Sequence, residues 1–160
     1  HTAERYEALV ISLLVARETV REPVIDSELI FAYAKCGDKH IADLENFIQD
    51  NHQADLIKVG DRCFDDNLYF AAKILYKKYG NRQKLASAYV MLREYQNAYD
   101  AAKAADIPRV WKSVCYACVR AKEFKFAKLC AINVIIKPDH IDERMQFRSP
   151  LLAIDCKSFV

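Results

Sequence analysis

A four-position pattern that recurs three times constrains this chain more than any other feature. The first position is a small residue. The second, three residues later, is Cys or Tyr; the third, nine residues after the first, is aromatic; and the fourth, twelve residues after the first, is Ala. The three copies are Gly60, Cys63, Tyr69 and Ala72; Ala86, Tyr89, Tyr95 and Ala98; and Cys115, Cys118, Phe124 and Ala127. All four positions shift together, by 26 residues and then by 29. A register kept through two helix-length segments is typical of stacked repeats, so the sequence predicts an all-α fold, an α-solenoid of stacked antiparallel helix hairpins.

Composition narrows the class of protein. The chain has 160 residues, of which 52% are hydrophobic and 29% charged, as expected for one globular domain with a substantial core. Its 24 basic and 22 acidic residues leave a net charge of +2, which gives no reason to expect nucleic acid as a partner. No apolar run is long enough for a membrane span. Residues 9–16 are apolar but short, and acidic Glu4 and Glu7 precede them, so they are not interpreted as a signal peptide. The six Cys lie in helical patterns, which favours reduced thiols in the cytoplasm.

Prolines and capping residues predict the first helix boundaries. Residues 6–22 form an amphipathic helix that ends because Pro23 cannot continue it. Asp26 and Ser27 supply capping oxygens for a second helix. Residues 29–34 of that helix are apolar on every side, so they are predicted to be buried.

Two glycine pairs mark later junctions. Gly37–Asp38 and Gly80–Asn81 each combine a C-terminal glycine with an N-cap for the next helix. Altogether the pattern predicts about ten short helices, with consecutive helices antiparallel because the loops are short. Residues 132–136 are rich in β-branched side chains and by propensity favour a strand. A lone strand would have no pairing partner in a helical stack, so a helix is predicted there too.

The repeated positions also predict the core. Small side chains at helix crossings let helix axes approach closely, and the repeated aromatic residues fill the space between layers. The predicted core therefore consists of the three copies of the pattern and four further large residues: Leu75, Leu92, Trp111 and Leu129.

Seven longer strings carry a resemblance to a known family. They are ELIFAYAK (28–35), VGDRCFD (59–65), YFAAKILY (69–76), KLAS (84–87), EYQNAYDAAKAA (94–105), WKSVCYACV (111–119) and KEFKFAKLC (122–130). In this order they resemble the clathrin heavy chain, specifically the repeat of its proximal leg, over residues 6–143. A generic helical-hairpin repeat would share only the spacing of small and aromatic residues. Residues 1–143 are therefore expected to form one α-solenoid repeat region, followed by a divergent C-terminal tail over residues 144–160.

The resemblance implies a structural scaffold rather than an enzyme. It implies a leg segment of the clathrin vesicle coat that acts by lattice assembly and light-chain docking, in endocytosis and intracellular vesicle transport. The implied partners are the clathrin light chain and other heavy-chain legs, with membranes contacted only indirectly through adaptors. The implied location is the cytoplasmic face of coated pits and coated vesicles. No cofactor and no catalytic or metal-binding residue is expected.

The residues themselves offer little chemistry. Cys115 and Cys118 have the spacing of a redox or zinc motif, but no second Cys or His pair accompanies them, and both occupy packing positions of the repeat. The four His are scattered, without a partner at ligand or triad spacing. Asp61 and Arg62 are expected to form a local ion pair. Asp65 and Asp66 at a helix boundary are interpreted as capping residues.

Basic residues supply the candidate docking surface. Lys73 and Lys77 are one helical turn apart and share a face. Such residues suit an acidic partner helix such as the light chain, whereas the simpler reading is a solvated surface. The candidate docking residues are Lys73, Lys77, Lys78, Arg82, Lys84, Lys103, Arg109 and Lys112.

Two alternatives to the coat scaffold follow from the same sequence. A vacuolar-sorting tether subunit carries the same loose repeat, although it would not be expected to share the strings quoted above. A redox or zinc protein built on Cys115 and Cys118 would contain bound metal or reactive thiols.

Overall fold

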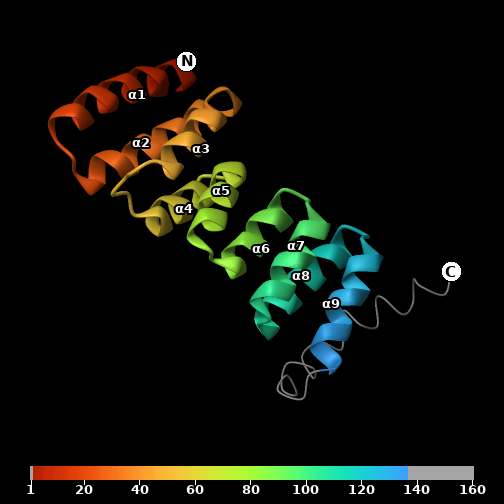
Figure 1. The fold of residues 1–160 in the computed structure, drawn as a ribbon. Coiled ribbons are helices and arrows are strands. Elements are labelled where there is room, and N and C mark those ends of the chain that lie inside the picture. The colour runs from red at the N-terminus through yellow and green to blue at the C-terminus, as the bar shows by residue number, and fades with distance from the viewer. Residues whose placement is uncertain (1, 137–160) are drawn as a thin grey trace. The chain divides into compact units, whose positions relative to one another are not determined.

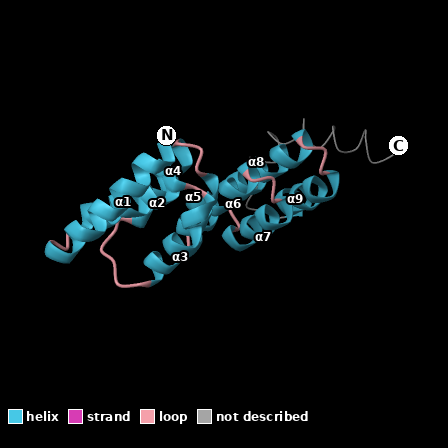
Figure 2. Cartoon of the chain, turned by 90° about the horizontal axis from the view of Figure 1, so that it is seen from above, coloured by secondary structure: helices cyan, strands magenta, loops and turns pink. Residues whose placement is uncertain are grey.

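The computed structural model describes residues 2–136, and every regular element in that range is helical (Figure 1). The elements are α1 (Thr2–Thr19), α2 (Pro23–Cys36), the 3-10 turn η1 (Asp38–His40), α3 (Ile41–Gln49), α4 (Leu56–Asp65), α5 (Tyr69–Tyr79), α6 (Arg82–Met91), α7 (Tyr95–Ala105), α8 (Pro108–Arg120) and α9 (Phe124–Ile136). The described residues contain no strand (Figure 2). The all-α prediction is therefore confirmed.

The chain divides into two compact units at the Gly80–Asn81 junction. In the first unit, α1 packs on α2, α4 packs on α5, and α3 contacts both α2 and α5. In the second unit, α6 packs on α7, α8 packs on α9, and α7 and α8 join the two hairpins. Each unit is thus built from helix hairpins, as the repeated pattern predicts.

The start of α2 differs from the prediction. The helix begins at Pro23, six residues before Leu29, rather than after the predicted caps Asp26 and Ser27. Proline is favoured in a first turn because its fixed φ is helical and its missing N–H needs no partner there. Asp26 and Ser27 therefore lie inside α2, and their side chains bind the segment that leads to α4. The prediction that residues 29–34 are buried is confirmed.

The glycine junctions are partly as predicted. Gly80 ends α5 in a left-handed conformation, and the Asn81 side chain accepts a hydrogen bond from the Lys84 N–H at 3.0 Å, which caps α6. Gly37 ends α2 with a φ of +78°, but Asp38 begins the 3-10 turn and makes no capping bond. The Asp38 prediction is wrong because η1 intervenes before α3 begins.

Residues 132–136 are helical and complete α9. Ala131 and Val134 are buried in a cluster with Trp111, Val114 and other apolar side chains of the second unit. Packing of one face against a neighbouring helix outweighs the β propensity of this segment. The helix prediction for 132–136 is confirmed.

Candidate docking surface and the core beneath it

The three copies of the repeated pattern share one turn geometry. In each, an N–H beyond the first helix donates to the carbonyl at the second pattern position: Leu68 to Cys63, Glu94 to Tyr89 and Glu123 to Cys118, at 2.8, 2.9 and 2.8 Å. The residue before each donor has a positive φ: Asn67 at 62°, Arg93 at 60° and Lys122 at 63°. This is the Schellman arrangement, which satisfies the last carbonyls of a helix. The equal spacing in the sequence thus reflects one hairpin turn built three times.

The small pattern positions are buried in all three copies. Gly60, Ala86 and Cys115 are buried at the first position, and Ala72, Ala98 and Ala127 at the fourth. The aromatic position is only half-buried in each copy: Tyr69, Tyr95 and Phe124. Tyr69 meets the Phe64 ring edge-on, with 5.1 Å between centroids. The repeated aromatic residues therefore border the hairpins, while Leu75 and Trp111 are fully buried and Leu92 and Leu129 are half-buried.

Side-chain volumes compensate across the hairpins. Gly60 lies against Tyr76, because a Cβ added to Gly60 would be 2.9 Å from Tyr76 Cε1. The positions equivalent to Tyr76 in the next two copies are Ala102 and Ala131, both buried. The copy with the smallest residue at the first position, Gly60, therefore has the largest residue, Tyr76, at the facing position. This compensation of volumes keeps the core close-packed.

Cys115 and Cys118 are fully buried side chains of α8. Burial raises the pKa of Cys115 to about 12 and that of Cys118 to about 11. The Cys115 thiol donates a hydrogen bond to the Ala127 carbonyl at 3.3 Å, so it packs α8 against α9. A reactive thiol needs a lowered pKa and exposure, and neither cysteine has them.

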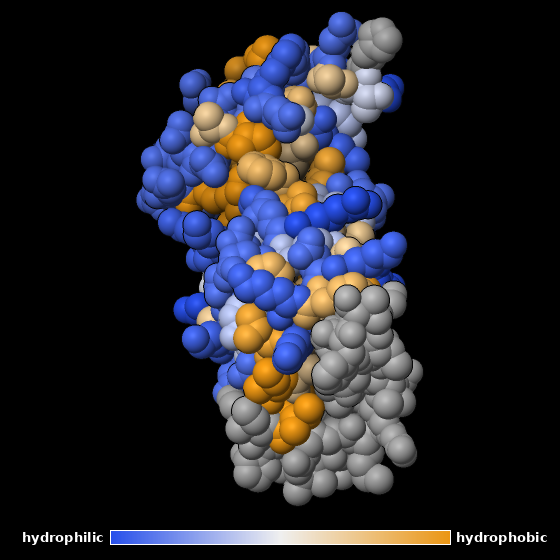
Figure 3. Space-filling model, turned by 90° about the vertical axis from the view of Figure 1, so that its right-hand side faces the viewer, coloured by the Kyte–Doolittle hydropathy of each residue, from blue (hydrophilic) through white to orange (hydrophobic). Residues whose placement is uncertain are grey.

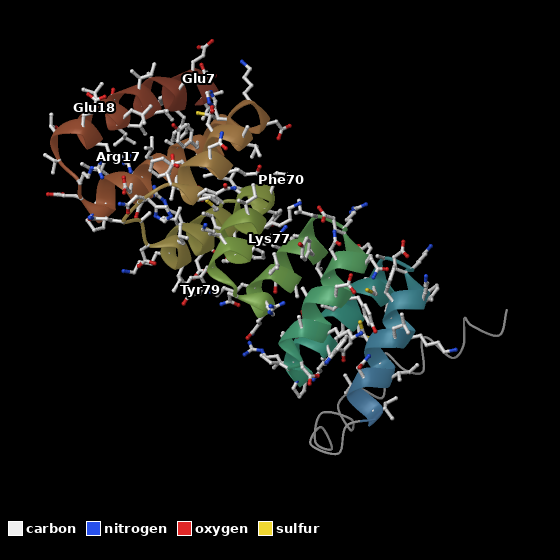
Figure 4. All side chains as sticks on the ribbon, in the orientation of Figure 1. Glu7, Arg17, Glu18, Phe70, Lys77 and Tyr79 are labelled. Atoms are coloured by element: carbon white, nitrogen blue, oxygen red, sulfur yellow. The ribbon has the colours of Figure 1, made fainter. Side chains whose placement is uncertain are left out.

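Polar networks in the first unit join residues far apart in sequence. Asp26 is 4% exposed and accepts hydrogen bonds from Arg17 Nε at 2.7 Å and from the Gln53 N–H at 2.8 Å. Arg17 reaches from α1 toward α2 (Figure 4) and also donates to the Asn51 carbonyl at 2.8 Å. A buried carboxylate needs such partners, so this network fixes α1 and the 50–55 segment on α2. Nothing in the sequence near Asp26 marks this residue as buried, so the network could not be predicted from local patterns.

The acidic residues of α4 also differ from the sequence interpretation. Arg62 pairs with Glu28 of α2 rather than with Asp61, and its guanidinium lies 3.7 Å from the Phe31 ring centroid. Asp61 accepts a hydrogen bond from the Tyr76 hydroxyl at 2.8 Å. Successive residues of a helix point in different directions, so the expected local pair is wrong.

The boundary between α4 and α5 carries no side-chain cap. Asp66 forms an ion pair with Lys35 of α2 at 2.8 Å, and Leu68 occupies the N-cap position of α5 without a side-chain hydrogen bond. Asp66 is the C-cap residue of α4 through its backbone N–H, so capping is confirmed for that position, whereas neither acidic side chain caps α5. The left-handed turn at Asn67 closes the end of α4 with backbone hydrogen bonds to its last carbonyls.

Among the histidines, His40 alone has a close acidic neighbour in the described range. Its Nδ1 lies 2.7 Å from Asp43 Oδ2, and its Nε2 lies 3.9 Å from Glu7 Oε1 of α1. His52 stacks on Phe47 with 6.1 Å between centroids. Residues 2–136 contain no group of three or more His, Cys, Asp or Glu side chains arranged to hold a metal ion. His1 and His140 lie outside the described residues.

The candidate docking residues fall in both units. Lys73, Lys77 and Lys78 lie on α5 in the first unit. Arg82 and Lys84 on α6, Lys103 on α7, and Arg109 and Lys112 on α8 lie in the second. Lys77, Lys78, Arg82, Lys103 and Arg109 are exposed, and the other three are half-buried. Arg109 lines a groove of about 170 Å³ with Gln83, Ser87 and Ser113. Figure 3 shows that polar side chains surround smaller apolar areas on one face of the molecule.

Within the described part of the chain, none of the helices has the length and apolar character needed to cross a bilayer. The predicted tail, residues 144–160, lies outside the described residues.

Comparison with known proteins gives a consistent family. A sequence model described as "Clathrin: Region in Clathrin and VPS" matches residues 2–126. The clathrin heavy chain of Drosophila melanogaster is 43% identical over 144 residues, 90% of this chain and 8% of that protein. That of Dictyostelium discoideum is 46% identical over 140 residues, 88% of this chain and 8% of that protein. Clathrin heavy chain 2 of Homo sapiens is 43% identical over 143 residues, 89% of this chain and 9% of that protein. The chain thus spans less than a tenth of the length of these relatives.

Proposed function

Because the chain belongs to the clathrin heavy-chain family, we propose that it is a segment of the structural scaffold of a clathrin coat. The observation that carries the proposal is an identity of 43–46% to clathrin heavy chains over about nine-tenths of the chain. The helix hairpins with buried small residues supply the supporting architecture. We assign residues 1–143 to the repeat region and residues 144–160 to a divergent tail.

The proposed mechanism is mechanical rather than enzymatic. Stacked hairpins form a leg, and many weak contacts between legs add up to a closed lattice that can still be taken apart. The partners are other heavy-chain legs and the clathrin light chain, and membranes are reached through adaptors. The location is the cytoplasmic face of coated pits and coated vesicles.

The exposed basic residues are the candidate docking surface for the light chain. Exposed charges at the border of an interface steer a partner and set its salt dependence more than they contribute to affinity. Lys77 and Lys78 on α5 and Arg82 on α6 are exposed to solvent and suit that role.

The coat scaffold is favoured over a vacuolar-sorting tether. The family description names VPS proteins as well as clathrin. The curated relatives quoted above are clathrin heavy chains, and their identity extends over 140–144 residues. A shared repeat alone would preserve spacing but not this level of identity.

A chimeric heavy chain tests the scaffold function. The matching segment of the Drosophila clathrin heavy chain would be replaced by residues 1–143, and cage assembly would be followed by light scattering and electron microscopy. We expect cages like those of the unmodified protein. A second chimera that also carries Ala98→Trp is the matched control, because Ala98 is 0% exposed and Trp overpacks the α6–α7 hairpin. A folded first chimera that assembles no cages would contradict the proposal.

Calorimetric titration of the chain with clathrin light chain tests docking separately. We expect saturable binding that weakens as salt is raised, because surface charges are screened at high ionic strength. Absence of binding to the folded chain would contradict light-chain docking. It would not contradict the scaffold function, which the cage assay tests.

A further inference from the structure

The solvent face of α5 combines an exposed aromatic residue with two lysines. Phe70, Lys73 and Lys77 are spaced i, i+3 and i+7, so at 3.6 residues per turn they lie within about 60° of one another. Ala71, Ala72, Leu75 and Tyr76 are buried on the opposite face. Figure 4 shows Phe70 and Lys77 on the same side of α5. We call these three residues the α5 stripe.

The stripe is partly organised before any partner binds. The Lys73 ammonium lies 4.1 Å from the centroid of the Phe70 ring, which is a cation–π contact. The Phe70 side chain is nevertheless 43% exposed. An ordered aromatic ring with accessible surface is the type of residue that anchors protein interfaces.

The charge of the stripe is not balanced within its own helix. The α5 sequence contains three lysines and no Asp or Glu. No ion pair within residues 2–136 involves Lys77 or Lys78. Lys73 and Lys77 are like charges at i and i+4, a spacing that slightly destabilises a helix. A partner that brings a carboxylate to Lys77 would balance the charge of that side chain.

We propose that the α5 stripe docks an acidic amphipathic helix of a partner protein. The partner helix carries two carboxylates one turn apart, which face Lys73 and Lys77, and an apolar side chain between them that covers Phe70. This inference rests on the proposed function, because α5 is part of the candidate docking surface, and it specifies the chemistry that the partner must present. Phe70 contributes affinity, and the lysines set orientation and salt dependence.

A protein helix fits the stripe better than a lipid surface does. From Phe70 to Lys77 the stripe is about 10 Å long, at a rise of 1.5 Å per residue. One aromatic ring and two lysines are too little for stable membrane anchoring, which needs a larger apolar face or a longer run of basic residues. The same length matches two turns of a partner helix.

The helix itself supplies a control for the test. Tyr79 is an aromatic side chain of α5 that is 50% exposed, and it lies nine residues from Phe70, about half a turn away around the helix axis. Figure 4 shows it away from Phe70 and Lys77. Removing either ring deletes exposed surface, so Phe70→Ala and Tyr79→Ala should fold equally well, as checked by circular dichroism.

Binding of three probes to the chain and its variants tests the proposal. The probes are clathrin light chain, a designed peptide of about 20 residues with Glu at i and i+4 around a Leu, and vesicles containing phosphatidylserine. We expect Phe70→Ala to weaken binding of light chain and peptide about 30-fold, which corresponds to about 2 kcal/mol. Tyr79→Ala should change both affinities less than about twofold. Lys77→Ala should flatten the dependence of affinity on salt.

The possible failures are distinguishable. If wild-type chain binds light chain and Phe70→Ala leaves that affinity unchanged, light-chain docking stands and the stripe proposal is overturned. If the peptide binds in a Phe70-dependent manner and light chain does not bind, the stripe proposal stands and the proposed light-chain partner fails. Phe70-dependent binding to vesicles alone, or binding of no probe, overturns the stripe proposal.

Discussion

Replacing Gly60 by Ala tests whether packing or backbone preference governs the α4–α5 hairpin. The added methyl would lie 2.9 Å from Tyr76 Cε1 and 3.2 Å from Tyr76 Cδ1, closer than carbon atoms approach without movement. The Tyr76 ring is buried, and its hydroxyl is held by the hydrogen bond to Asp61 at 2.8 Å. The ring therefore cannot move aside without losing that bond or shifting α5.

One favourable and two unfavourable free-energy terms decide the result. Ala is favoured over Gly inside a helix by about 1 kcal/mol. Overpacking a filled core costs about 1–3 kcal/mol, and losing a hydrogen bond to a charged group costs about 1.5–3 kcal/mol. Only part of the hydrogen-bond cost applies if the Tyr76 ring moves slightly. We expect Gly60→Ala to lower the free energy of unfolding by about 1–2 kcal/mol, because the packing cost exceeds the propensity gain.

Urea denaturation followed by circular dichroism measures the effect, and a double-mutant cycle identifies its origin. In a Tyr76→Ala background the ring is absent, so Gly60→Ala should stabilise by about 1 kcal/mol. The fluorescence of Trp111, which lies in the second unit, gives a second probe in the same experiment. Stabilisation by about 1 kcal/mol in both backgrounds would refute the packing argument.

Three further predictions follow from turns, thiols and a helix cap. Arg93→Gly should raise the free energy of unfolding in urea by about 1 kcal/mol, because Arg93 has a φ of 60° that Gly adopts without strain. Destabilisation would show that contacts of the Arg93 side chain stabilise the chain by more than this strain costs. Burial raises the pKa of Cys63 and of Cys115 to about 12, so an aromatic disulfide reagent at pH 8 should label these thiols only after unfolding, and rapid labelling of the native chain would contradict this. Hydrogen bonds from the Lys58 N–H and ammonium lower the pKa of Asp55, so the stability from this N-cap is present at neutral pH and is lost as pH falls through that lowered pKa. Asp55→Asn should weaken this acid dependence, and an unchanged profile of stability against pH would contradict it.

Local patterns in the sequence were sufficient for the helical repeat. The spacing of small and aromatic residues predicts the hairpins, and the structure places the left-handed residues Asn67, Arg93 and Lys122 at one equivalent turn position. The cap at Asn81 was also predictable, because an N-cap interacts with backbone groups only three residues away. These features depend on neighbours within one or two helical turns.

Contacts between distant segments could not be predicted in the same way. The sequence predicts a helix cap at Asp26, but this residue is buried and accepts hydrogen bonds from Arg17 and Gln53. Arg62 pairs with Glu28, 34 residues earlier, rather than with its neighbour Asp61. Helix propensity and charge do not reveal which side chain from another element will face a residue.

The sequence by itself determined the all-α repeat, its register and the family, because helical periodicity and the strings that carry the resemblance are local properties of the chain. The tertiary structure decided which side chains pack against one another in the core of the repeat and which charged groups find partners. It sets Gly60 against Tyr76, directs Asp26 into the interior, and leaves Phe70 exposed beside Lys73. Volume complementarity and buried ion pairing arise between segments that are distant along the chain, so they become visible only when the helices are packed together.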